Sequence, residues 1–244
     1  MIEVLKNSKQ ISDARKALNQ IGADSSTGLA RLIYTLRFSL RFRRKVEPVA
    51  INKSWDVYRI LKTIEKFKPK KETPIYDMGS YNCEIPLALW SQGYRNLYAA
   101  DFNPLGRSIN WYGNNIKFRQ ENFYESTIEK HSLEVITALS VIEHGFEQVN
   151  FFKVCNDLLK SGGLVLITTD FHQKKIAIDP KFTIFNLSYM IFSKEEILSL
   201  IDEAKLNGFE LIDNNFPDNW SESENPINFL DHDMSFIFLG FRKK

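Results

Sequence analysis

Two carboxylates near the ends of short apolar runs are the first residues whose type and spacing suggest chemistry. Asp77 lies near the end of one run and is followed by a turn of small and polar residues, 79–82. A helix pattern follows from Ile85, and the next apolar run, 96–100, leads to Asp101. Helix-start N–H groups attract polar or anionic ligands, and a carboxylate at the tip of the next strand can accept hydrogen bonds from both hydroxyls of a ribose. The pattern therefore predicts a binding site for a ligand that contains a nucleoside.

A second set of polar side chains follows two later apolar runs. Glu143 and His144 come shortly after the run 133–139, and Asp170 and His172 come after the next one. The unperturbed pKa of histidine, about 6.5, suits it to exchange protons near neutral pH. Because the carboxyl ends of parallel strands meet at one edge of a sheet, we expect these four side chains on the same rim.

The elements that must hold these side chains alternate between strands and helices. Seven apolar runs predict strands at about residues 74–78, 96–100, 116–120, 133–139, 164–169, 209–212 and 234–241. Helices are predicted between them at about residues 85–90, 104–112, 146–159 and 194–207. This alternation is typical of an α/β fold with a doubly wound, mostly parallel sheet. We predict a seven-stranded sheet with an antiparallel edge strand, preceded by an N-terminal helical extension.

Two parts of the chain depart from this alternation. Residues 1–71 are predicted to form a helical, basic extension or lid, with a first helix from Ile2 to about Leu18, and residues 72–244 form the main domain. The segment 170–192 is rich in aromatic residues and is interpreted as a long insert rather than a sheet element. Long loops in compact domains are usually functional. After the insert, Ser193 and Glu196 have the spacing of a capping box at the start of the next helix.

Composition indicates a globular protein with an uneven distribution of charge. The chain has 244 residues, of which 43% are hydrophobic, and its net charge is +2. Residues 1–72 contain 17 Lys and Arg against 7 Asp and Glu, whereas the remainder contains 15 against 23. The sequence has no apolar run of the roughly 18 residues that a membrane span needs, and no apolar segment typical of a secretory signal near its start. With only two cysteines, in no zinc-like spacing, we expect a cytoplasmic protein.

The most basic segment, 29–45, has apolar residues on two faces of a predicted helix and six basic residues without an acid. One interpretation is a helix that packs on the main domain and also forms a lid or a contact with a second copy of the chain. The other is a basic surface for an anionic acceptor or a membrane. No nucleic-acid-binding motif accompanies the charge, so no nucleic-acid partner is expected.

The chain resembles the Rossmann-like (class I) S-adenosylmethionine-dependent methyltransferases over about residues 72–213. Five pieces in the family's order carry the resemblance: 76–80 (YDMGS), 100–102 (ADF), 122–123 (NF), 136–144 (ITALSVIEH) and 158–163 (LLKSGG). The later segments 192–196 and 208–209 resemble the late helix and strand of the family. The Thr168-Thr169-Asp170 strand end and the aromatic insert are similar to those of methyltransferases from bacterial surface-polysaccharide pathways.

The resemblance implies S-adenosyl-L-methionine as the cofactor. It implies that Asp101 accepts hydrogen bonds from the ribose and that Phe102 lies against the adenine. The cofactor-binding residues that it implies are Asp77, Gly79, Ser80, Tyr81, Asp101, Phe102, Asn122, Phe123, Ser140 and Val141. The sequence departs from the family in one place, because Tyr81 and Cys83 stand where the family has its second and third glycines. That departure reduces backbone freedom near the cofactor and also argues against a dinucleotide site.

The resemblance also places Glu143 and His144 next to the transferred methyl group. His144 is interpreted as the general base or as the group that positions the acceptor, and Asp170 as a second base or an anchor for acceptor hydroxyls. Carboxylates with imidazole could instead bind a divalent ion, although we expect no metal.

The expected acceptor is a hydroxyl of a sugar, a glycan intermediate or another small molecule. The alternatives are a lipid, quinone or macromolecular acceptor, or a module that binds the cofactor without catalysis.

Overall fold

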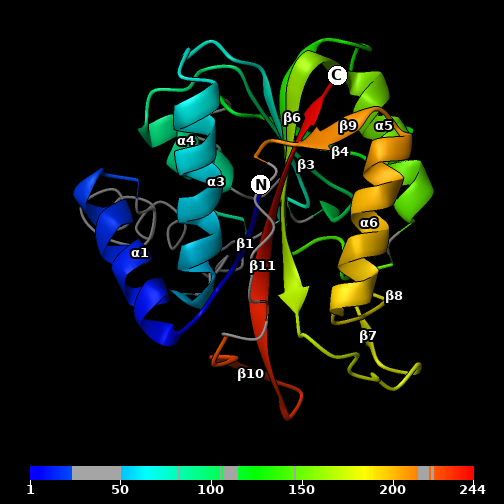
Figure 1. Ribbon diagram of the computed structural model, residues 1–244. Helices are drawn as coiled ribbons and strands as arrows, with labels where there is room; N and C mark the ends of the chain where they lie inside the picture. The colour runs from blue at the N-terminus through cyan, green and yellow to red at the C-terminus, as the bar shows by residue number, and fades with distance from the viewer. Residues whose placement is uncertain are drawn as a thin grey trace. The chain divides into compact units, whose positions relative to one another are not determined.

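The computed structural model describes residues 1–23, 51–81, 83–104, 106, 115–145, 147–213, 220 and 223–244 (Figure 1). The chain forms two compact units. Unit 1 contains residues 1–10 and 127–244, and unit 2 contains residues 11–126. The predicted helix at 29–45 and most of the one at 104–112 lie outside the described residues.

Unit 2 contains the predicted strand–turn–helix–strand arrangement. Its elements are α1 (Ser8–Gln20, which begins in unit 1), η1 (Ile51–Lys53), α3 (Ser54–Phe67), β2 (Ile75–Met78), α4 (Ile85–Ser91), β3 (Leu97–Asp101), β4 (Lys117–Gln120) and η3 (Phe123–Glu125). β2, β3 and β4 pair in parallel, with Asp77 opposite Ala99 and Asp101 opposite Gln120. The two polar strand ends therefore lie at the same edge of these strands, as the sequence predicts.

The helices of unit 2 are built around one apolar face each. α3 buries Val57, Ile60, Leu61 and Ile64, which recur at helical spacing. It packs beside α4, as Figure 1 shows. Pro86 lies in the first turn of α4, where a missing N–H costs little.

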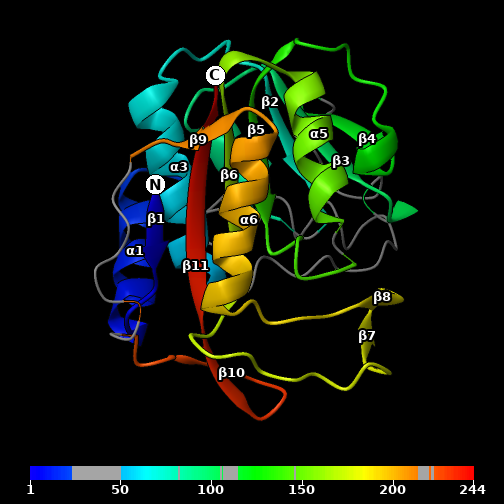
Figure 2. The same ribbon diagram turned by 45° about the vertical axis from the view of Figure 1, so that its right-hand side comes forward.

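Unit 1 is built around one long strand. Its elements are β1 (Ile2–Val4), β5 (Leu133–Leu139), α5 (Gln148–Leu158), β6 (Leu159–Phe171), β7 (Thr183–Ile184), β8 (Leu187–Ser188), α6 (Lys194–Leu206), β9 (Phe209–Leu211), β10 (Ile227–Phe229) and β11 (His232–Lys243). β5 and β6 are parallel, and β11 runs antiparallel to β6. β1, β9 and β10 also pair antiparallel with β11. α5 and α6 lie side by side over these strands (Figure 2).

Both units show an α/β fold. The strand pairs that carry the predicted site residues, β2–β3, β3–β4 and β5–β6, are parallel, and β11 pairs antiparallel with β6. α6 begins with the predicted capping box, because the Ser193 hydroxyl accepts the Glu196 N–H and the Glu196 carboxylate accepts the Ser193 N–H. None of the helices within the described ranges is both long and apolar enough to cross a membrane.

Three local predictions were wrong. Ile2–Val4 is a strand rather than the start of a helix, and α1 begins only at Ser8, after Asn7 accepts the Gln10 N–H on its side chain. β1 and β10 pair with β11 in addition to the expected strands. The insert 170–192 contains the hairpin β7–β8, so it is not only a loop.

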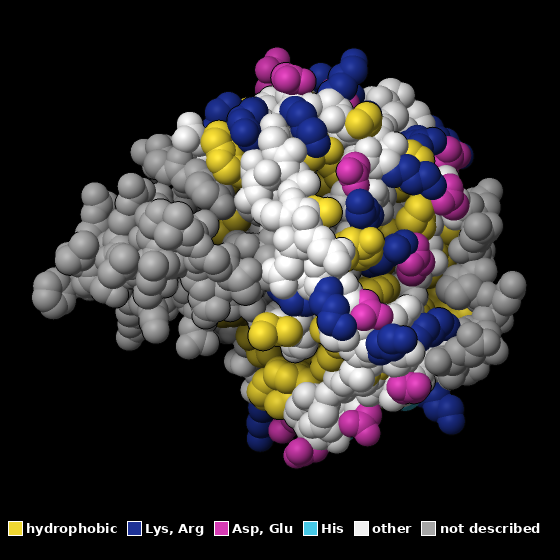
Figure 3. Space-filling model, turned by 90° about the vertical axis from the view of Figure 1, so that its left-hand side faces the viewer, with side chains coloured by type: hydrophobic (Ala, Val, Ile, Leu, Met, Phe, Trp, Pro, Cys, Tyr) yellow, Lys and Arg dark blue, Asp and Glu magenta, His cyan; other side chains and the backbone are white. Residues whose placement is uncertain are grey.

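The basic residues of the first part of the sequence are only partly described. Six of the 17 Lys and Arg of residues 1–72 lie in the range 24–50, outside the described residues. Over the described surface of one face, Figure 3 shows basic and acidic side chains interspersed with hydrophobic ones.

Candidate functional site

The first candidate site lies in unit 2, in the turn that follows β2 (the glycine turn, residues 79–83). Gly79 has a φ of +71°, a conformation that side chains disfavour. The Ser80 hydroxyl lies 2.7 Å from the Asp77 carbonyl oxygen and 2.8 Å from Asp77 Oδ2. The Ser80 N–H donates to the Ala100 carbonyl at 2.9 Å, and the Ala100 N–H donates to Ser80 Oγ at 3.1 Å. Ser80 therefore fixes the glycine turn to β3.

Asp101 holds the same turn from the end of β3. Its Oδ2 accepts the Tyr81 N–H at 2.9 Å, and its Oδ1 accepts the Asn103 N–H at 2.7 Å. Burial raises the pKa of Asp101, and these two N–H groups act in the opposite direction. Each carboxylate oxygen has a second lone pair, so both oxygens can accept a further hydrogen bond from a ligand. Tyr81 thus contributes its main-chain N–H to the hydrogen bonds that hold the glycine turn.

Three of the predicted cofactor-binding residues, Phe102, Asn122 and Phe123, lie in different environments. Phe102 is 54% exposed and presents its ring to solvent. The Asn122 side chain accepts the Tyr124 N–H at 3.2 Å and starts η3. Phe123 is buried, with its ring centroid 6.0 Å from that of Tyr76. Phe102 is therefore the one of these rings that is open to a ligand, whereas Phe123 belongs to the core of unit 2.

Glu121, which the sequence did not single out, lies next to this group at the end of β4. Its carboxylate accepts hydrogen bonds from the Tyr76 hydroxyl at 3.0 Å, the Ser126 hydroxyl at 2.8 Å and Arg119 Nε at 3.0 Å. Burial alone raises the pKa of Glu121, but these donors outweigh it and hold the pKa below its usual value. An acid directly after a strand is the signal that could have identified it.

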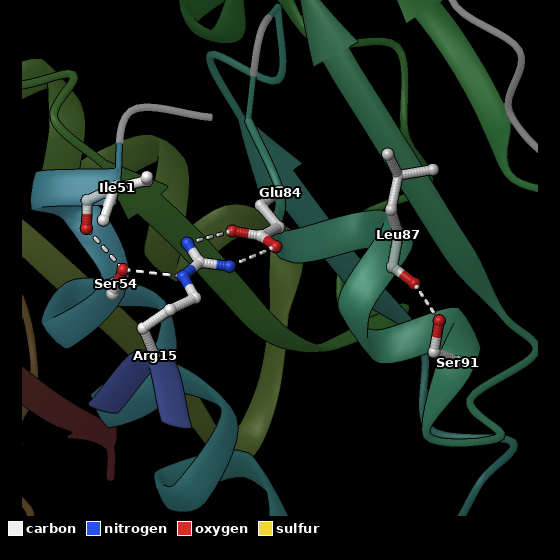
Figure 4. Close-up of polar contacts among 6 residues, drawn as sticks. All are labelled: Arg15, Ile51, Ser54, Glu84, Leu87 and Ser91. Carbon is white, nitrogen blue, oxygen red and sulfur yellow. Dashed lines mark hydrogen bonds and ion pairs between the residues drawn. The ribbon is translucent and has the colours of Figure 1, made fainter. Parts of the chain in front are cut away.

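A buried ion pair supports the other end of the glycine turn. Glu84 precedes α4 and is fully buried, and Arg15 of α1 donates to both of its carboxylate oxygens at 3.0 Å (Figure 4). Arg15 Nε also donates to Ser54 Oγ at 2.9 Å, and that hydroxyl in turn donates to the Ile51 carbonyl. The start of α4 is therefore joined to α1 and α3 through one guanidinium.

The second candidate site lies in unit 1, after β5 and β6. Ser140 has a φ of +51°, which is uncommon for a residue with a side chain, and its N–H donates to the Thr168 carbonyl at 3.0 Å. The Val141 carbonyl accepts the His144 N–H at 3.0 Å, so a tight turn carries the chain from β5 to the histidine.

Two carboxylates are buried beside this turn. Glu143 is 1% exposed, and its Oε2 accepts a hydrogen bond from the Thr169 hydroxyl at 2.9 Å. Asp170 Oδ2 accepts the hydroxyl of Tyr189 at 2.6 Å. Burial, followed by the charge of Asp170, raises the pKa of Tyr189 far above its usual value, so this phenol remains a donor.

His144 lies among aromatic rings that come from the insert. Its ring centroid is 5.5 Å from that of Tyr189 and 5.9 Å from that of Phe185. The backbones of the two segments are also paired, because the Gly145 N–H donates to the Ser188 carbonyl and the Met190 N–H donates to the Glu143 carbonyl, both at 3.0 Å. The insert therefore positions the histidine.

The structure thus gathers some of the predicted rim residues and not others. Tyr189 contacts both Asp170 and His144, although the sequence did not predict a role for it. His172 instead turns to its own loop, where Nδ1 accepts the Lys174 N–H at 3.1 Å. Within the described residues, no group of three or more His, Cys, Asp and Glu side chains is arranged to hold a metal ion.

Comparison with known proteins identifies solved structures that share the fold of this chain. No protein-family model and no curated protein matches the chain. Among solved structures, the cyclase SpnF has a TM-score of 0.57 at 13% identity and covers 99% of this chain and 98% of its own. A SAM-dependent methyltransferase from Leishmania major has a TM-score of 0.57 at 12% identity, covering 96% of this chain and 83% of its own.

A third match is a complex with bound cofactor. It is phosphoethanolamine N-methyltransferase 2 of Haemonchus contortus with S-adenosyl-L-methionine, at a TM-score of 0.54 and 15% identity. This chain is covered over 94% of its length and that one over 60%. Likeness at these identities concerns the fold and leaves substrates open. The chain therefore has the α/β fold that the S-adenosylmethionine-dependent methyltransferases share.

Proposed function

We propose that this chain is an S-adenosylmethionine-dependent methyltransferase. The observation that carries the proposal is the Asp101 carboxylate, which is fixed to the glycine turn by the Tyr81 N–H and keeps acceptor capacity on both oxygens. Gly79, with its positive φ, lets the backbone approach the ligand, and the exposed ring of Phe102 suits an adenine. S-adenosylmethionine supplies, when bound, a methyl group on a cationic sulfonium that is open to in-line displacement.

His144 is proposed to take the proton from the acceptor or to position it. The imidazole is half-buried, and the rings of Phe185 and Tyr189 contact it. These contacts fix the orientation of the imidazole before an acceptor binds, so less freedom is lost on binding. A positioned histidine contributes about 10² to 10⁴ in rate when it exchanges a proton with the reacting group. Asp170 accepts the hydroxyl of Tyr189, whose ring contacts His144, and Glu143 accepts the hydroxyl of Thr169.

The acceptor is proposed to be a hydroxyl of a sugar or of another small hydroxylated molecule. The half-buried imidazole of His144 beside the exposed ring of Phe185 supports it, because such an acceptor has both polar edges and apolar faces. We also propose that the protein is cytoplasmic, that it has no nucleic-acid partner and that it uses no metal. A contact with a membrane or a second copy through residues 29–45 is a proposal on residues outside the described ranges.

A second function is a cofactor-binding protein that does not transfer methyl groups. The specific observation in its favour is the replacement of two glycines by Tyr81 and Cys83, of which Cys83 is buried. Lipid, quinone or macromolecular acceptors remain alternatives for an active enzyme.

Calorimetry with S-adenosylmethionine and S-adenosylhomocysteine tests the cofactor, and absence of binding by both contradicts the proposal. Transfer of a labelled methyl group to a panel of mono- and oligosaccharides tests the reaction. His144→Ala is expected to lower this transfer about 10²-fold or more while cofactor binding is retained. His172→Ala is the matched control, because His172 contacts its own loop, and it is expected to keep wild-type transfer. Full turnover by the His144 variant rules out its role as base.

A further inference from the structure

Two hairpins of unit 1 place an apolar residue where the backbone favours Asn or Gly. Phe185 and Asn186, between β7 and β8, have φ angles of +57° and +64°. Leu230 and Asp231, between β10 and β11, have φ angles of +53° and +59°. Two-residue turns with both φ angles positive strongly prefer Asn-Gly or Asp-Gly, because side chains crowd the backbone there. Both turns are therefore strained at their first residue.

Phe185 also leaves an apolar ring in contact with water, because 59% of the residue is exposed. Its ring is not isolated, since it stands nearly perpendicular to that of His144, at 79° and 5.9 Å between centroids. Leu230 is also exposed, but the neighbouring Phe229 is the residue that contacts Tyr189, at 5.5 Å. The strain is common to both turns, and what distinguishes Phe185 is the contact of its exposed ring with His144.

We propose that Phe185 is the platform on which the ring of a sugar acceptor lies. This inference rests on the proposed function and deepens it by giving the acceptor a binding surface. The face of an aromatic ring is electronegative and attracts polarised C–H groups. A sugar ring presents such C–H groups on one face and its hydroxyls around the edge. A sugar on Phe185 therefore brings its edge hydroxyls toward the neighbouring imidazole of His144.

The competing occupant is a phenol or catechol, which stacks on an aromatic ring through its own π-face. The buried carboxylates Asp170 and Glu143 already accept the hydroxyls of Tyr189 and Thr169, so they do not distinguish the two occupants. We commit to the sugar because the proposed acceptor is a sugar hydroxyl, which a ring lying on Phe185 brings toward His144. The phenolic ligand forms the second arm of the test.

The test compares two substitutions at equivalent turn positions. Phe185→Asn and Leu230→Asn each introduce a residue that tolerates positive φ, so both variants are expected to fold and to unfold at or above the wild-type temperature. Saturation-transfer NMR is carried out on the full chain with S-adenosylhomocysteine present. The probes are methyl glycosides of glucose, galactose, mannose and rhamnose, and separately catechol.

We expect the wild type to saturate the ring C–H protons of at least one glycoside. Loss of one aromatic stacking contact in Phe185→Asn is expected to weaken that glycoside about tenfold. Leu230→Asn is expected to bind as the wild type, and Phe185→Tyr, which keeps a ring, is expected to restore binding.

Three results overturn the platform: a wild type that binds no glycoside, a wild type that binds only catechol, or equal glycoside binding by Phe185→Asn. Calorimetry of the same samples separates this failure from that of the proposed function. If S-adenosylhomocysteine binds while the glycoside result is negative, only the sugar platform is wrong. If S-adenosylhomocysteine does not bind either, the proposed cofactor site is wrong as well.

Discussion

Each buried carboxylate of the two candidate sites accepts a hydrogen bond from a donor within its own unit. Asp101 accepts two backbone N–H groups, whereas Glu143 and Asp170 accept the hydroxyls of Thr169 and Tyr189. A backbone donor cannot be removed by changing a side chain, so the geometry at Asp101 is insensitive to the identity of residue 81. The hydrogen bond from residue 81 to Asp101 therefore does not depend on the tyrosine side chain.

Cofactor binding is expected to weaken on acidification because of Asp101. Burial raises the pKa of this carboxyl above the usual value of about 3.9, so protonation begins at a higher pH than for an exposed aspartate. The ionised form accepts hydrogen bonds on both oxygens and the protonated form loses acceptor capacity, so affinity falls as the pH falls through that pKa. Titration calorimetry with adenosine and S-adenosylhomocysteine between pH 7 and about 4 measures this.

Asp101→Asn is the reference for this pH dependence. The variant is expected to bind more weakly at pH 7 and to lose the acid-side decline, because an amide does not titrate in this range. A wild-type affinity that is flat over the same range contradicts the assignment of Asp101 to the ribose.

The local features that sequence patterns predicted correctly depend on residues close in the chain. The capping box of Ser193 and Glu196 is set by a spacing of three, and the position of Asp101 at the end of its strand is set by the apolar run before it. Phe123 illustrates the limit, because its burial against Tyr76 depends on a partner that a motif does not show. Tyr189 was missed for the same reason, since its contact with His144 arises only when the insert folds back.

At the scale of elements, both sites are held by segments that lie outside the alternating strands and helices. In unit 2, α1 contributes Arg15 to the buried Glu84 before α4. In unit 1, the segment around β8 pairs with residues 143–145. Neither connection follows a period of 2 or 3.6 residues, so hydrophobic patterns could predict the elements but not these attachments.

Removal of the Arg15 guanidinium is expected to destabilise the protein strongly. Arg15→Ala leaves the buried Glu84 without its bidentate donor, which costs about 3–5 kcal/mol in the free energy of unfolding. Lys16→Ala removes an exposed ion pair with Asp13 from the same helix and is expected to cost about 0–1 kcal/mol. Urea denaturation measures both.

An apolar replacement of the pair distinguishes charge burial from packing. Arg15→Met combined with Glu84→Leu removes both charges and is expected to recover most of the stability lost in Arg15→Ala. Equal stability of Arg15→Ala and Lys16→Ala contradicts a structural role for the pair.

Gly145 is expected to be sensitive to substitution by alanine. Its φ is +58°, and a Cβ atom there lies 3.2 Å from Leu187 Cδ2, so the Leu187 side chain of β8 must give way by a few tenths of an ångström. Gly162→Ala is the control, because Gly162 has a φ of +72° but nothing lies within 4 Å of its Cβ position. Both variants carry a conformational cost of about 1–2 kcal/mol.

Methyl transfer separates the two alanine variants. Only Gly145→Ala is expected to lose transfer well beyond its loss of stability, because β8 leads directly to Tyr189 beside His144. Similar transfer by the two variants, measured on folded protein, argues against the insert as a positioning device.

At the scale of the whole molecule, β11 is the strand on which unit 1 depends. It pairs with β1, β6, β9 and β10, and its residues Phe236, Phe238 and Phe241 are fully buried. Phe241 joins an aromatic cluster with Phe152 of α5, at 5.4 Å between ring centroids. Unit 2, in contrast, is a continuous stretch of the chain.

The aromatic cluster is expected to dominate the stability of unit 1. Phe152 has ring centroids of Phe151, Phe209 and Phe241 within 5.1–5.7 Å, and Phe152→Ala is expected to cost about 3–5 kcal/mol. Val149→Ala changes an exposed position of the same helix and is expected to lie within about 0.5 kcal/mol of wild type. Denaturant unfolding compares them, and a similar midpoint for both refutes the expectation.

The pairing of β1 with β11 also has a consequence for synthesis on the ribosome. Ile2 and its partner Leu239 are 237 residues apart in the chain (239 − 2), so β1 is made long before the strand that covers it. At about 5–20 residues per second this interval is on the order of 10–50 seconds, during which Ile2 and Val4 have no strand to cover them. Unit 2 is complete once residue 126 has emerged, whereas unit 1 closes only after translation reaches β11. We therefore expect nascent chains truncated before β11 to need a chaperone at their N-terminal strand.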